Sequence, residues 1–269
     1  MKLQRHLLTF TTLAMLTGLP IGSQAQSAVD IQQDDSAPLA LVYRGPAGCE
    51  GCSEAVAEVL KTSKYHFRIQ YVGPNEKLKI TEDNLAKAAL YAQPGGGDDE
   101  VSASYSIGNA SLVAVQNYVR NGGHYLGVCM GAYLAGDVGF GLVNAKVYSE
   151  VDRPDSLVHN SADTVTPVIW RGKKRWMYFQ DGAALPADPQ GSSPLVLARY
   201  PNNDIAAAIY NFGEGTVGLV GPHPEADQEW YKREDLENPD GVNQDLAYDL
   251  ISATMRKNGT DLFNPANSN

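Results

Sequence analysis

The chain has 269 residues, 43% of them hydrophobic, and a formal net charge of −10 at pH 7. This length can bury a sizeable core, and one large domain is favoured over two. The acidic balance argues against nucleic acid as a partner, because phosphate repels it and the only basic run, Lys173-Lys174-Arg175, is typical of a solvated hairpin turn.

The first 25 residues are interpreted as a signal peptide. Lys2 and Arg5 give a basic start, residues 7–19 form an apolar stretch too short to span a membrane, and Ser23-Gln24-Ala25 offers small residues for cleavage. Cleavage there removes two of the 21 basic residues and none of the 31 acidic ones, which gives a net charge of −12. We therefore predict an exported protein, periplasmic or extracellular, with no membrane association after cleavage.

The first half of the remaining chain alternates between expected strands and helices. Residues 26–38 are polar and are interpreted as a flexible lead-in. The apolar run at 39–43 is typical of a buried parallel strand and is expected to begin the fold. Further elements are expected as helices over 53–61, 83–88 and 104–120, and as strands over 66–72, 89–92 and just before Cys129.

The second half is richer in expected strands. They cover 164–171, 175–179, 194–200, 205–212 and 216–220, and a closing helix covers 243–257. Residues 258–269 are polar and are expected to form a C-terminal tail. The pattern predicts one α/β domain over 39–257, a three-layer sandwich with a β-rich extension.

One cysteine lies at a position typical of a nucleophile. Gly127-Val128-Cys129-Met130-Gly131 follows a short apolar run and opens a small-residue stretch, so Cys129 is expected at a sharp strand-to-helix turn. Small neighbours are required there because bulky ones would collide with the backbone. Backbone N–H groups at the start of a helix favour a thiolate and can hold an oxyanion. An inert buried thiol remains the alternative.

A cysteine nucleophile needs a base and a group that orients the base. His223 is the best-placed histidine, because it follows the expected strand at 216–220 and so lies at the carboxyl edge of the sheet, where open α/β sheets place their sites. Glu225, two residues on, can hold the imidazole in one tautomer. His124 begins the strand that leads to Cys129 and is expected at the opposite edge.

A glycine loop supplies a third element. Pro94-Gly95-Gly96-Gly97-Asp98 follows an expected strand, and glycines let backbone N–H groups approach a ligand closely, as an oxyanion hole requires. Alone, a triple glycine is more often only a turn. Because the triple glycine occurs together with Gly-x-Cys-x-Gly and His-x-Glu, in this order, an active-site loop is a stronger interpretation than a simple turn.

The other two cysteines, Cys49 and Cys52, are interpreted as a disulfide that export would permit. They lie in the loop after the first strand, at the same expected edge as Cys129. A structural disulfide is favoured over a redox pair. We find no metal signature, phosphate loop or dinucleotide fingerprint, and we predict no cofactor.

The three motifs together resemble the biotin-protein ligase N-terminal domain-like family, within the class I glutamine amidotransferase-like superfamily. The likeness runs from about Leu39 to Ile251 and includes the stretch Tyr178-Phe179-Gln180-Asp181-Gly182. It implies a flavodoxin-like sheet and a Cys129–His223–Glu225 triad. It also implies oxyanion donors from the backbone near Gly96 and Met130.

In amidotransferases the cysteine attacks the glutamine side-chain amide, ammonia leaves, and a thioester is hydrolysed. This sequence shows neither a synthetase domain that would use ammonia nor a biotin-ligase catalytic domain. We therefore expect hydrolysis of an amide in a small molecule or peptide. A ligand-binding or regulatory module that retains the triad is the alternative, and a thiol–disulfide protein based on Cys49 and Cys52 is a third. The sequence carries no signal for an oligomeric state.

Overall fold

A computed structural model describes residues 36–187, 193–257 and 260–261. The expected signal peptide, most of the lead-in and most of the tail lie outside these residues. The fold below belongs to the unit Gln33–Asn269. Within the described residues, no helix is both long and apolar enough to cross a membrane.

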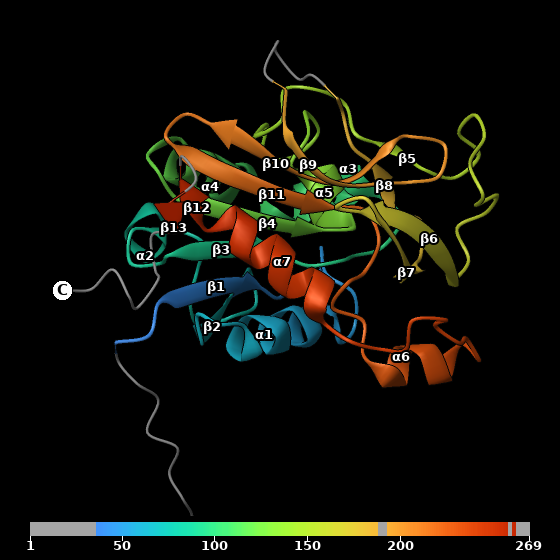
Figure 1. The fold of residues 1–269 in the computed structure, drawn as a ribbon. Coiled ribbons are helices and arrows are strands. Elements are labelled where there is room, and N and C mark those ends of the chain that lie inside the picture. Colours follow the sequence, from blue (N-terminus) through green and yellow to red (C-terminus); the bar gives the residue numbers. More distant parts are fainter. Residues whose placement is uncertain (1–35, 188–192, 258–259, 262–269) are drawn as a thin grey trace, which may run out of the picture. The chain divides into compact units, whose positions relative to one another are not determined.

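A nine-stranded sheet organises the unit, in the order β2-β1-β3-β4-β11-β10-β9-β6-β7 (Figure 1). The first five strands in that order are parallel neighbours, and the remaining four continue the sheet with antiparallel pairs. Their bounds are β1 (Leu39–Tyr43), β2 (Arg68–Val72), β3 (Leu90–Gln93), β4 (His124–Val128), β6 (Thr164–Trp170), β7 (Lys173–Phe179), β9 (Leu195–Arg199), β10 (Ile205–Phe212) and β11 (Gly215–Val220).

Helices cover both faces of the parallel half, which makes the domain a flavodoxin-like three-layer sandwich (Figure 1). One apolar core joins α1 (Cys52–Thr62) and α7 (Asp245–Thr254) to the sheet. A second core lies on the other face, under α2 (Glu82–Leu85), α3 (Glu100–Ile107), α4 (Asn109–Arg120) and α5 (Met130–Leu134). Because both faces are covered, β1, β3, β4 and β11 are buried along their whole length, as continuous apolar strands should be.

The single helix expected over 104–120 is wrong, because the chain forms two helices there, α3 and α4. Gly108 separates them with φ 83° and ψ 142°, a conformation that is open mainly to glycine. The first of the two also begins earlier than expected. Asp99 caps it by accepting hydrogen bonds from the N–H groups of Val101 and Ser102, both at 3.0 Å.

The β-rich second half does not form a separate layer. Its strands extend the parallel sheet through the antiparallel β10–β11 pair. Several short elements were not expected from the sequence. They are α6 (Gln228–Arg233) and the two-residue strands β5 (Tyr148–Ser149), β8 (Ala183–Ala184), β12 (Arg256–Lys257) and β13 (Thr260–Asp261).

Candidate active site

Four loops meet beyond the carboxyl ends of the parallel strands. They follow β1, β3, β4 and β11, and they carry respectively Cys49, Gly96, Cys129 and His223. Since β2 and β3 lie on opposite sides of β1, the chain also changes direction across the sheet at this point. Open α/β sheets bind ligands at such switch points.

Cys129 occupies the strained turn that the sequence predicts. Its φ of 50° and ψ of −109° lie outside the regions that non-glycine residues favour. A Cβ on Gly131 would lie 2.1 Å from the carbonyl oxygen of Gln93, and one on Gly127 would lie 2.5 Å from the carbonyl oxygen of Gly131. Both glycines of the Gly-x-Cys-x-Gly motif are therefore required by close backbone approach.

The Cys129 thiol is free and buried, with the residue 4% exposed. Its backbone N–H donates to the Val220 carbonyl at 2.9 Å, which joins the turn to the end of β11. Its Sγ contacts the Gln180 carbonyl oxygen at 3.6 Å, within the range of a thiol hydrogen bond. The loop after β7, 51 residues away in the sequence, thus forms one wall around the sulfur.

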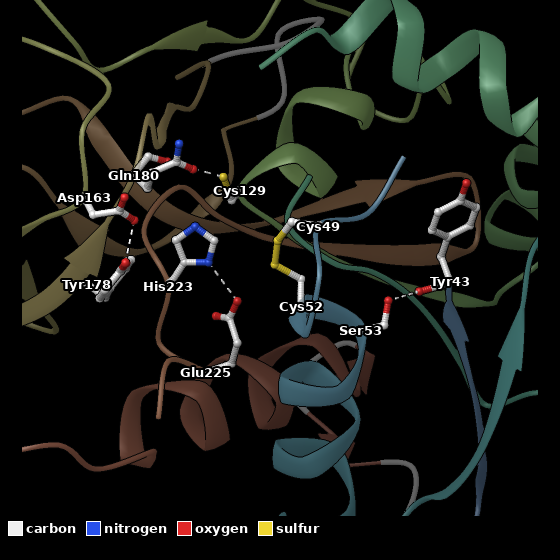
Figure 2. Close-up of a disulfide and its surroundings, with 10 residues drawn as sticks. All are labelled: Tyr43, Cys49, Cys52, Ser53, Cys129, Asp163, Tyr178, Gln180, His223 and Glu225. Carbon is white, nitrogen blue, oxygen red and sulfur yellow. Dashed lines mark hydrogen bonds and ion pairs between the residues drawn. A yellow bond between two sulfur atoms is a disulfide. The ribbon is translucent and has the colours of Figure 1, made fainter. Parts of the chain in front are cut away.

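His223 and Glu225 form a buried pair beside Cys129 (Figure 2). The His223 Nδ1 lies 2.8 Å from Glu225 Oε1, and their side chains are 3% and 1% exposed. The backbone N–H of His223 donates to the Tyr178 carbonyl at 2.8 Å. The Trp230 ring lies 5.3 Å from the imidazole, centroid to centroid. These contacts fix the position of the imidazole, and the carboxylate favours a proton on Nδ1.

The surroundings of His223 raise its pKa well above the ordinary value. Burial by itself lowers the pKa, because it disfavours the charged ring. Electrostatic interaction with the Cys129 and Glu225 side chains, together with the hydrogen bond between Nδ1 and Glu225, outweighs that effect. The arrangement therefore favours a protonated His223 imidazole beside Cys129.

Gly96 lies against the start of α5. A Cβ there would lie 2.4 Å from the Ala47 carbonyl oxygen and 2.8 Å from Met130 Cγ. Gly96 and Met130 also line one cavity together with Cys129. The structure thus brings together the two residues whose backbone N–H groups are predicted to hold an oxyanion.

Two cavities flank the cysteine–histidine pair. The first, about 210 Å³, is lined by Cys129 and Met130 and by the charged residues Asp98, Glu100, Lys146 and Asp181. The second, about 270 Å³, is lined by His223, Trp230 and both Cys49 and Cys52. Gly96 and Gln180 line both cavities, which therefore adjoin.

Cys49 and Cys52 form a disulfide, with their Cα atoms 5.3 Å apart (Figure 2). The loop that contains it braces the glycine loop, because the Cys49 N–H donates to the Gly95 carbonyl at 3.0 Å. A Cβ on Gly95 would lie 2.9 Å from His223 Cε1 and 3.4 Å from Cys52 Sγ. The disulfide is therefore adjacent to the candidate base as well as to the oxyanion loop.

Replacing both Cys49 and Cys52 with serine is expected to slow the amide hydrolysis that the sequence predicts by up to about 10²-fold, since misplacing a site by about 1 Å can have that effect. The loss follows from a looser contact between the disulfide loop and Gly95. Turnover of one amide probe by the variant and by wild type measures it. Equal rates would show that the disulfide does not position the site.

Neither His124 nor His159 lies at the site. His124 is at the opposite end of β4, with Nδ1 2.6 Å from Thr216 Oγ1, and His159 pairs with Asp152 on the surface. Arg44, which follows β1, pairs with Glu54 and Glu76 and lines neither cavity. In the described part of the chain, no group of three or more His, Cys, Asp and Glu side chains could hold a metal ion.

Sequence reasoning did not identify Gln180, Trp230 or Lys146 as site residues. Gln180 acts through a backbone carbonyl, so its side chain gives no signal. Trp230 lies on a short helix that the sequence did not predict. The resemblance around residues 178–182 was the one indication that the loop after β7 reaches Cys129.

Comparison with known proteins agrees with this fold. Residues 39–154 match the family described as biotin-protein ligase, N terminal. An uncharacterized protein of Chlamydia muridarum is 27% identical over 189 residues, which cover 62% of this chain and 72% of that protein. A solved glutamine amidotransferase from Thermotoga maritima has a TM-score of 0.53 and 12% identity, with 80% of this chain and 95% of that chain covered. Residues 39–154 are therefore similar to the biotin-protein ligase N-terminal family, and the chain has the fold of the glutamine amidotransferase-like proteins.

Proposed function

We propose that this protein is an exported amide hydrolase in which Cys129 is the nucleophile and a thioester is the intermediate. The observation that carries the proposal is the buried His223–Glu225 pair beside a cysteine on a strained turn. A nucleophile, a base and an orienting carboxylate in this order are the parts that covalent amide hydrolysis needs. The substrate is an amide of a small molecule or peptide.

In the proposed reaction, the Cys129 thiolate attacks the carbonyl carbon of the amide and a C–S bond forms. The carbonyl electron pair moves to oxygen, and the backbone N–H groups of Gly96 and Met130 stabilise the resulting oxyanion. The His223 imidazolium gives its proton to the amide nitrogen, the C–N bond breaks, and the amine leaves. Water then attacks the thioester, His223 accepts a proton from that water, and the C–S bond breaks to release the acid.

The pKa of His223 predicts how activity depends on pH. Because that pKa is raised, the imidazolium that protonates the leaving amine persists above the ordinary value of about 6.5. Activity should therefore fall only when the pH rises past the raised pKa of His223, which lies above the ordinary value. Glu225→Gln removes one charge that raises the pKa, so the fall should occur at lower pH. The profile of kcat/KM against pH measures the shift, and an unmoved alkaline limb in the variant would contradict the role of Glu225.

Iodoacetamide labelling combined with an amide library tests the function itself. We expect Cys129 to be labelled near neutral pH faster than an ordinary thiol, and at least one amide to release ammonia, an amine or an acid. If Cys129 reacts at the rate of an ordinary thiol and no amide is turned over, the proposal of an amide hydrolase is wrong. The triad would then belong to a ligand-binding or regulatory module.

Export is part of the proposal, and residues 1–25 support it. The N-terminal sequence of the mature protein tests it directly. We expect it to begin at Gln26 in a periplasmic or extracellular fraction. An intact Met1 in a protein retained in the cytoplasm would contradict export.

A further inference from the structure

The nucleophile and the base open onto different cavities. Cys129 lines the first cavity and His223 lines the second, while Gly96 and Gln180 line both. In the proposed reaction the acyl part of the substrate remains on Cys129, whereas the leaving amine exchanges a proton with His223. The second cavity is therefore the space in which the leaving amine should lie.

The size of the second cavity exceeds what ammonia needs. Its volume is about 270 Å³, whereas a molecule of water occupies about 30 Å³ in the liquid. A primary amide would leave most of this space empty of substrate. A substituted amine would fill it.

The walls of the second cavity favour an amine that carries an aromatic or apolar group. Tyr178 and Trp230 pack edge to face, with centroids 5.4 Å apart, and both line the cavity. Its charged lining residues are the three acids Glu50, Asp163 and Glu234, against Arg233 and the His223 imidazolium. Aromatic rings beside an excess of carboxylates suit an amine that carries an aromatic group. The ring of such an amine packs against Tyr178 and Trp230 while its nitrogen lies near negative charge.

We propose that the cavity lined by His223, Tyr178 and Trp230 binds the leaving amine, and that the substrate is a secondary amide whose amine carries an aromatic or apolar group. The inference rests on the proposed function and narrows its substrate class. A site that accepts a leaving amine must, by microscopic reversibility, also bind an amine that attacks the thioester. Transfer of an acyl group to added amines therefore probes the cavity without knowledge of the natural acyl group.

The transfer balances as follows. 4-Nitrophenyl acetate acetylates Cys129 and releases nitrophenolate. The nitrogen of an added amine attacks the thioester carbon, a C–N bond forms and the C–S bond breaks. The amine loses one proton to His223, which passes it to the departing sulfur. The products are an N-acetyl amine and the free thiol.

The experiment acetylates the full chain with 4-nitrophenyl acetate and offers phenethylamine or methylamine at equal free-base concentration. Mass spectrometry then measures both N-acetyl products. We expect saturation with phenethylamine and about tenfold more product from it than from methylamine, because aromatic contacts and burial favour the larger amine. Trp230→Ala should bring the ratio of the two products close to one, and Trp230→Phe should restore most of the preference.

Tyr105→Ala is the matched control, because Tyr105 is 88% exposed and lines neither cavity. It should keep the wild-type ratio. Equal yields from the two amines in wild type, or a preference that survives Trp230→Ala, would contradict the proposal that the second cavity binds the leaving amine. The proposal that the protein is an amide hydrolase would be unaffected. If no nitrophenolate burst depends on Cys129, the proposal that the protein is an amide hydrolase would be contradicted, and the proposed amine site would be contradicted with it.

Discussion

His223→Ala is expected to lower the rate of amide hydrolysis by about 10²- to 10⁴-fold, the usual contribution of a positioned acid or base. In the proposed reaction this variant loses both the group that activates Cys129 and the proton donor for the leaving amine. Labelling of Cys129 by iodoacetamide at pH 7 should slow by about tenfold or more, because an unactivated thiol is only a few per cent ionised there. Single-turnover hydrolysis and the labelling rate measure the two effects separately.

His159→Ala is the control for this variant. His159 is a surface histidine whose side chain is 71% exposed and pairs with Asp152. It should leave both rates at the wild-type level. If His223→Ala and His159→Ala hydrolyse and react alike, the imidazole beside Cys129 does not activate the thiol.

Gly131→Ala is expected to destabilise the fold by about 1–3 kcal/mol or more, the cost of forcing an added group into a packed site. The new Cβ would lie 2.1 Å from the Gln93 carbonyl oxygen at the end of β3, so the backbone itself would have to move. In a chain of this size each kcal/mol lowers Tm by about 2–4 °C. Thermal unfolding followed by circular dichroism measures the change.

Gly97→Ala is the matched control for the loss of stability. A Cβ on Gly97 meets no atom within 4 Å, and Gly97 is exposed. Its Tm should therefore stay near the wild-type value. A wild-type Tm for Gly131→Ala would show that β3 and the turn at Cys129 do not approach as closely as described.

The parallel half of the fold is predictable because four of its five strands, β1, β3, β4 and β11, are buried from end to end. β1 and β4 read as short apolar runs, and the glycines around Cys129 indicate the turn that follows. The division between α3 and α4 was not predicted, because Gly108 inside an apolar helical pattern is normally tolerated. The backbone conformation at a single residue decides that boundary.

The candidate site also has some residues that the sequence predicts and others that it does not. Cys129 and His223 are predictable because each follows the end of a strand, Cys129 after β4 and His223 after β11. These two strands are parallel neighbours in the sheet. The contact of Cys129 with Gln180 and the wall supplied by Trp230 depend on how distant loops fold back over that edge. Such contacts leave no periodic pattern in the sequence, so the two cavities could be found only in the structure.

Mass spectrometry of the chain after brief reaction with 4-nitrophenyl acetate tests the central claim, nucleophilic activation of Cys129, most directly. We predict one acetyl group per chain, located on the peptide that contains Cys129, and its formation should be faster than on the unfolded protein and slower in His223→Ala. Acetylation of Cys129 at the same rate in the folded protein, the unfolded protein and the variant would contradict the account.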